Sequence, residues 1–181
     1  MRNTTVIGDT AREPVYGMAK NVDWETVFLT GVKSCANHMF RIAYGILRHP
    51  ADAEDAVGSS VLTAYAKIQT LKTADSFKPW IMKILVRECY AILRKRKKTD
   101  LYDQIPDIPV MEPYRDGELW NAVRQLEDKF RAVVMLFYYE DMSIETIAGI
   151  LSLPRGTVKS RLSRARSKLR QWMTEGGLLY E

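Results

Sequence analysis

The sequence predicts an all-α protein: two small helical domains joined by an acidic linker, the C-terminal domain containing a helix-turn-helix. Apolar residues recur every three or four positions through most of the 181 residues, as on one face of a helix. No segment reaches four clean alternations of apolar and polar residues, the pattern of a half-buried strand. Residues 99–117 interrupt the helical period with three prolines and five acids, which is typical of a linker.

These patterns divide the chain into five parts. We expect an N-terminal extension, a first domain, the linker, a second domain and a short tail, at residues 1–23, 24–98, 99–117, 118–175 and 176–181.

Three helices are predicted in the first domain. The first ends at His49–Pro50 and carries an inward stripe of Phe28, Val32, Cys35, Met39, Ile42 and Ile46. The second opens with acids that suit the positive end of its dipole, and it buries Val57, Val61, Tyr65 or Ala64, Ile68 and Leu71. The third begins after Ser76, a residue type that caps helices, and packs Trp80, Ile81, Ile84, Leu85, Cys89 and Ile92.

The second domain resumes the helical period. Its first apolar stripe comprises Leu119, Val123, Leu126, Phe130, Val133 and Phe137, and a shorter helix over Ser143–Leu151 follows. The final helix opens at Pro154 and has a stripe at intervals of four, three, four and three: Val158, Leu162, Ala165, Leu169 and Trp172. Its opposite arc is cationic and hydroxylic. Two helices joined by so tight a turn, the second basic, predict a helix-turn-helix.

Composition excludes several classes of protein. With 46% hydrophobic and 27% charged residues, the sequence is that of a soluble globular protein, and we expect a cytoplasmic location. Two cysteines make no disulfide framework, and Cys35 with His38 falls short of the four ligands of a closed zinc site. No Gly-rich phosphate loop or nucleophile–base pair stands out. We therefore expect no catalytic residue, no metal, no cofactor and no small-molecule substrate.

Charge is distributed unevenly along the chain. The net charge is +7 over residues 1–99, −4 over 100–117, −3 over 118–154 and +5 over 155–181. Two basic regions separated by acidic ones suit a phosphate-bearing partner that is contacted at two places, although clustered charge is also typical of a solvated face. A basic amphipathic helix can also lie on a membrane surface, but the narrow apolar stripe of the last helix favours DNA.

Several segments resemble a known family. They read "SIETIAGILSLPRGTVKSRLSRARSKLRQ" (143–171), "MFRIAYGILRHPADAEDAVGSSVLTAYAKI" (39–68) and "FKPWIMKILVRECYAILRKRKK" (77–98). In this order, with a short linker, they resemble bacterial extracytoplasmic-function sigma factors. The resemblance implies that the chain binds core RNA polymerase and promoter DNA, that an anti-sigma factor holds it inactive, and that the linker runs through the RNA exit channel.

The resemblance also implies three sets of site residues. The readers of the minus-35 duplex would be Arg155, Gly156, Thr157, Lys159, Ser160, Ser163 and Arg164. The residues that capture the melted minus-10 strand would be Lys72, Ser76, Phe77, Lys78, Lys83, Arg87 and Arg94, with Phe77 and Trp80 either lining a base pocket or lying in the core. The contacts to core polymerase would be Asp52, Glu54, Asp55, Ser59 and Leu62.

Three positions depart from the family pattern. Gly58 and Ser59 replace a glutamine and an acid, Arg87 and Ala91 replace an asparagine and an aspartate, and Glu127 replaces a proline. The first departure leaves open a sigma-like DNA-binding regulator that does not act through core polymerase. A helical interaction protein that binds acidic partners is a third reading. The resemblance favours a sigma factor, which directs transcription initiation by the polymerase and is not itself an enzyme.

Overall fold

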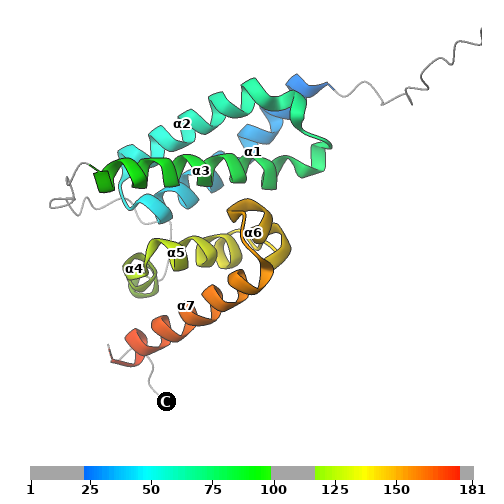
Figure 1. Cartoon of the computed structure of the whole chain (residues 1–181). Coiled ribbons are helices and arrows are strands. Elements are labelled where there is room, and N and C mark those ends of the chain that lie inside the picture. Colours follow the sequence, from blue (N-terminus) through cyan, green and yellow to red (C-terminus); the bar gives the residue numbers. More distant parts are fainter. Residues whose placement is uncertain (1–22, 99–116, 176–181) are drawn as a thin grey trace, which may run out of the picture.

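The computed structural model describes residues 23–98 and 117–175, and every regular element in these two stretches is a helix (Figure 1). The predicted all-α class is therefore confirmed for the described part of the chain. The expected extension, linker and tail lie outside it, except that Asp23 caps the first helix and Gly117 begins the fourth.

The first three helices form one bundle. They are α1 (Trp24–Leu47), α2 (Pro50–Lys67) and α3 (Phe77–Lys98), with 3-10 turns at Ile68–Thr70 and Ala74–Ser76 between the last two. The Asp23 carboxylate accepts hydrogen bonds from the first free amides of α1. Arg48 ends α1 in the left-handed region, at φ 59°, and Pro50 occupies the first turn of α2.

The second bundle holds the remaining helices. They are α4 (Gly117–Gln125), α5 (Asp128–Val134), the π-helix η3 (Met135–Tyr139), α6 (Ile144–Leu151) and α7 (Arg155–Glu175). The chain breaks between α4 and α5 even though Glu127 stands in place of a proline. The buried guanidinium of Arg131 secures this corner, because it donates to the carbonyl oxygens of Arg124 and Leu126 and to the Asp128 carboxylate.

Most predicted core residues are buried. The others, except Tyr65, are half-buried against the same core: Val32, Val57, Val61, Trp80, Ile92, Leu119, Phe137, Ile144, Leu169 and Trp172. Two positions show why the prediction was inexact. Ala64 is fully buried whereas Tyr65 is 65% exposed, so the smaller of the two alternatives faces inward. Phe137 is half-buried, and Met135 and Leu136 fill the core instead. The reason is the π-helix, whose wider turn shifts the inward positions away from the 3.6-residue period.

The two bundles pack against each other, which the sequence did not predict. The last turns of α1 are buried all round, and α1 contacts α5 and η3 while α3 contacts α6. Met135 of η3 packs directly against Gly45 of α1, where an added Cβ would lie 2.6 Å from the end of the Met135 side chain. Tyr44 stacks near Trp120 of α4, with ring centroids 6.2 Å apart. The buried residues of both bundles form one continuous core.

Candidate nucleic-acid interface

Helices α6 and α7 make the predicted helix-turn-helix. The Ser143 hydroxyl caps α6 by accepting from the Thr146 amide at 3.1 Å. Ser152 ends α6 in the left-handed region, at φ 55°. The carbonyl of Pro154 then accepts from the amides of Thr157 and Val158, which starts α7 at once. The turn is therefore fixed by backbone and cap hydrogen bonds.

One narrow side of α7 is buried and the opposite side faces solvent. Val158, Leu162 and Ala165 are 0–4% exposed and pack on α4, α5 and α6. Of the seven predicted minus-35 readers, Thr157 is half-buried and the other six are exposed. The seven therefore share the free face of one helix, in the first three turns, where a helix in the major groove meets base edges.

Two contacts on this face bear on how it would meet DNA. A Cβ on Gly156 would touch nothing within 4 Å, so the chain's own packing does not require glycine there. Arg155 lies 3.3 Å from Glu145 of α6, and both side chains are more than half exposed. Because exposed ion pairs are weak, Arg155 can leave Glu145 for a phosphate or a base.

The predicted minus-10 residues fall into two groups on and near α3. Lys83, Arg87 and Arg94 lie within about 40° of arc on one face of the helix, since each residue turns about 100°. Lys83 is half-buried and the two arginines are exposed. Lys78 lies on a different side of α3, next to the second bundle, and pairs with Glu140 there at 3.0 Å. Exposed Lys72 and half-buried Ser76 lie just before α3, where Ser76 hydrogen-bonds to Thr73.

A cavity of about 430 Å³ lies between α1 and the start of α3. Its lining includes Val27, Gly31, Asp75, Phe77 and Lys78. Phe77 is 5% exposed, and its ring fits against α1 where Gly31 has no side chain: a Cβ there would lie 2.5 Å from the ring. Phe77 is thus both a core residue and a wall of the cavity. Trp80 is half-buried and contacts Phe77, with ring centroids 5.7 Å apart, but it does not line the cavity.

The outer face of α2 carries four of the five predicted polymerase contacts. Glu54, Asp55 and Ser59 are exposed, and Leu62 is 74% exposed. Asp52 differs because it is partly buried and pairs with Arg96 of α3. Sequence reasoning missed Tyr65, an exposed aromatic three residues after Leu62. The sequence held a signal for this exposure: the adjacent Ala64 could fill the inward position of the stripe and leave Tyr65 facing outward.

In residues 23–98 and 117–175, no three His, Cys, Asp or Glu side chains gather as metal ligands. Within the same ranges, no helix has the length and apolar character needed to span a bilayer.

A basic helix-turn-helix is typical of a DNA-binding protein, and a second cationic face lies on the neighbouring bundle. Comparison with known proteins then specifies the family. The profile "Sigma-70 region 2" matches residues 32–99, and the profile "Sigma-70, region 4" matches residues 116–169. The chain belongs to the sigma-70 family of RNA polymerase sigma factors, in its extracytoplasmic-function group.

Individual relatives agree with this assignment. The RNA polymerase sigma factor SigV of Bacillus subtilis is 28% identical over 165 residues, which cover 89% of this chain and 99% of SigV. The ECF RNA polymerase sigma factor SigW of the same organism is 26% identical over 156 residues, covering 76% of this chain and 83% of SigW.

A solved structure agrees as well. The sigma factor RpoE of Bartonella quintana, solved in complex with the anti-sigma factor NepR, matches with a TM-score of 0.68 and 25% identity. The match covers 84% of this chain and 97% of RpoE.

Proposed function

We propose that this sigma factor directs core polymerase to promoters by reading the minus-35 duplex with α7 and the melted minus-10 strand with the first bundle. The observation that carries the proposal is the division of α7 into a narrow buried stripe and a free arc of cationic and hydroxylic residues. Arg and Lys can pair with guanine edges, and Ser and Thr can reach bases or phosphates. A helix that only filled a core would not expose this arc.

The minus-10 role rests on two neighbouring features of the first bundle. The stripe of Lys83, Arg87 and Arg94 suits the phosphates of a single strand. The cavity beside Phe77 has room for one unstacked base, and Lys78 and Asp75 at its lining offer polar partners. Arg87 differs from the asparagine usual in the family, so we expect a minus-10 preference particular to this chain.

The polymerase would dock on the outer face of α2. Glu54, Asp55, Ser59 and Leu62 share this face with Tyr65, and two exposed apolar side chains beside carboxylates suit a protein partner. Asp52 contributes indirectly, since its pairing with Arg96 holds α2 against α3. An anti-sigma factor, such as the NepR that binds the similar RpoE, would cover part of the same surfaces.

Reconstituted transcription tests the proposal. Core polymerase, genomic DNA fragments and the purified chain should give start sites that are absent without the chain. A matched chain with Lys159→Ala and Arg164→Ala should lose most of these starts while retaining its helical content. Core polymerase that gains no start site from the intact chain, on any fragment, would contradict the proposed function.

Gly58 and Ser59 favour one alternative, a sigma-like regulator that binds DNA without core polymerase. The two readings differ in a pull-down. A sigma factor retains core polymerase on the immobilised chain, and Leu62→Ser with Tyr65→Ser lowers the retained amount. The regulator would retain DNA but no polymerase, and these substitutions would change nothing.

A further inference from the structure

Glu140 is a buried carboxylate that the promoter-reading function leaves unexplained. It follows the π-helix η3, and its side chain is 0% exposed. Its oxygens lie 2.9 Å from Nδ1 of His38, 3.2 Å from the Arg41 guanidinium and 3.0 Å from Nζ of Lys78. All three basic groups belong to the first bundle, whereas Glu140 belongs to the second. A single carboxylate thus joins the two bundles through three basic side chains.

One of these groups, Lys78, is also a proposed contact for minus-10 DNA. In the arrangement seen here, its ammonium group faces the Glu140 carboxylate. A carboxylate and a phosphate both offer anionic oxygens to a lysine, so they compete for it. The same side of α3 carries Met82 and Val86, which are buried at 0% and 2% exposure. Their helical positions lie between Lys78 and Tyr90, a residue that shares a cavity with the start of α5.

The packed arrangement is also too short to read both promoter elements at once. Elements centred at minus-35 and minus-10 are about 25 base pairs apart, or about 85 Å of duplex. A compact chain of this size has a diameter of about 40 Å. The eighteen residues between α3 and α4 can reach at most about 60 Å when extended, which is enough to let the bundles separate. Promoter recognition therefore requires an open form.

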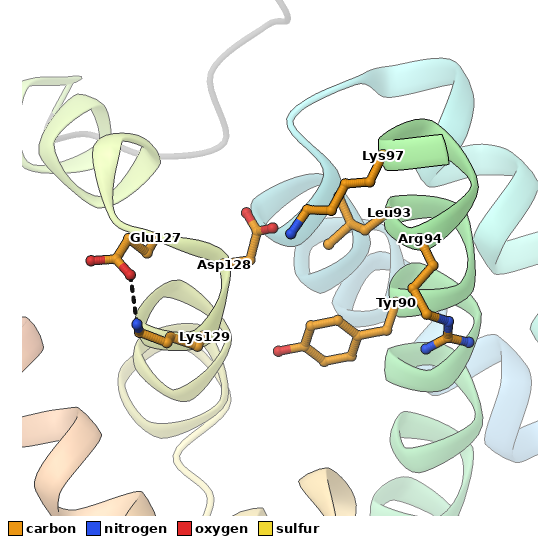
Figure 2. A pocket seen from close by; sticks show the side chains of 7 residues that line it. All are labelled: Tyr90, Leu93, Arg94, Lys97, Glu127, Asp128 and Lys129. Carbon is orange, nitrogen blue, oxygen red and sulfur yellow. Dashed lines mark ion pairs between the residues drawn. The ribbon is translucent and has the colours of Figure 1, made fainter. Parts of the chain in front are cut away.

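The interface between the bundles has the character of one that opens. Gly45 and Met135 form an apolar contact there, and polar contacts also cross the interface. Arg131 donates to the carbonyl of Ile46 at 2.9 Å, and Arg48 donates to the carbonyl of Arg124 at 3.1 Å. At one end an open groove of about 510 Å³ lies between the bundles. Figure 2 shows Tyr90, Leu93, Arg94 and Lys97 of α3 across it from Glu127, Asp128 and Lys129.

We propose that Glu140 latches a closed, autoinhibited conformation, in which its carboxylate pairs with Lys78 in place of a promoter phosphate. The segment 118–154, which supplies α5, η3 and α6 to the interface, has a net charge of −3, and the first bundle is net positive, so local attraction between these surfaces supports the same closure. Opening breaks the contacts of Glu140 and frees Lys78 for the melted strand. The competition for Lys78 rests on the proposed function, but the latch itself does not.

The distance between the bundles tests the latch directly. Donor and acceptor dyes on Ala66→Cys of α2 and Arg170→Cys of α7 report it in the full chain, because both positions are exposed and the native Cys35 and Cys89 are buried. Glu140→Gln keeps the shape of the side chain and removes its charge, so the population should shift from short to long distances. Glu127→Gln is the matched control: this exposed carboxylate pairs with Lys129 and Lys168 of its own bundle, and the distances should not change.

Binding of a fluorescent single-stranded oligonucleotide of mixed sequence tests the competition. If the closed form holds about nine-tenths of the chain, Glu140→Gln lowers the apparent Kd about tenfold, and Glu127→Gln does not. Distances that stay short in Glu140→Gln would overturn the latch. Long distances with an unchanged Kd would overturn the competition for Lys78. A different result would contradict the proposed function instead of the latch: a variant that opens but still supports no transcription with core polymerase.

A second variant opens the interface without changing any charge. Gly45→Leu places a side chain where Met135 now packs, so it should wedge α1 away from η3 and lengthen the same distance. Gly45→Leu replaces Glu140→Gln in the test if circular dichroism shows that Glu140→Gln has lost helical content. If this folded variant opens and its Kd stays at the wild-type value, closure does not block the single strand and the proposal is wrong.

Discussion

At the scale of single residues, two side chains of α7 should carry most of the base recognition. Lys159 and Arg164 are exposed on the reading face, and each should contribute contacts that the helix backbone cannot replace. We expect Lys159→Ala and Arg164→Ala each to weaken binding to a cognate minus-35 duplex by about 1–3 kcal/mol. Fluorescence anisotropy at fixed salt measures this.

The control is Arg170→Ala, an exposed cation on the same helix about 9 Å beyond Arg164. It should weaken cognate and scrambled duplexes equally. Lys97→Ala, at the end of α3, should likewise lower affinity evenly across sequences and flatten the salt dependence. If Lys159→Ala and Arg164→Ala bind the cognate duplex as the parent does, α7 is not the reader.

A second residue-scale prediction concerns Cys89. Burial raises the pKa of its thiol to about 12, from 9.0 for a free thiol. Between these values the unfolded chain loses the proton and the folded chain keeps it, so deprotonation favours unfolding. We therefore expect the free energy of unfolding to fall as pH rises from about 9 to about 12, by up to about 1.4 kcal/mol per pH unit from this group.

Urea unfolding at several alkaline pH values measures the decline, and Cys89→Ala supplies the comparison. The variant should begin less stable, because it leaves a small cavity, but its stability should fall less steeply over this range. Equal slopes for the two chains would show that the Cys89 thiol is not responsible.

At the scale of single helices, α2 contains an avoidable weakness at Gly58. This residue is exposed in the middle of the helix, and a Cβ there would meet nothing within 4 Å. Gly58→Ala should raise the free energy of unfolding by about 1 kcal/mol, because glycine loses more backbone entropy on folding. Thermal and urea unfolding check this. A matched substitution at Gly45, whose Cβ would contact Met135, should instead destabilise the chain.

Most helices could be predicted from the apolar period, since each has one side against its own bundle. The stripe of α7 is an example, with Val158, Leu162 and Ala165 all buried as predicted. The period failed at η3, because a π-helix moves the inward positions and nothing in residues 135–139 marks it. The apolar period also could not decide between Ala64 and Tyr65, because either of these neighbouring residues could continue the inward stripe of α2.

The candidate site was predictable where it lies on one helix and not where it depends on distant segments. The exposed cationic and hydroxylic arc of α7 follows from a single amphipathic period, whereas its expected role as the minus-35 reader comes from the family resemblance. The pairing of Lys78 with Glu140 joins residues 62 positions apart, and no local pattern indicates it. One indirect signal existed: residues Ile42–Leu47 are apolar on every side of α1, which is typical of a helix buried on two faces. Its second face meets the other bundle.

At the scale of the whole molecule, the continuous core couples the stabilities of the two bundles. Residues of α1 and α3 are buried against α5, η3 and α6, so neither bundle can unfold without exposing part of the other's core. We therefore expect a single heat-absorption peak for the intact chain in differential scanning calorimetry, with equal calorimetric and van't Hoff enthalpies. Glu140→Gln, which removes the ionic link, should broaden the peak or divide it in two.

The same experiment carries its own control. Glu127→Gln changes a carboxylate of equal charge that contacts lysines of the second bundle alone, so its single peak should persist with a small shift at most. Two peaks in the intact chain would mean that the bundles are independent domains, and that the ion pairs of Glu140 contribute little to their association. One peak that divides only when Glu140 is neutralised ties the cooperativity of the whole chain to the carboxylate that we propose as the latch.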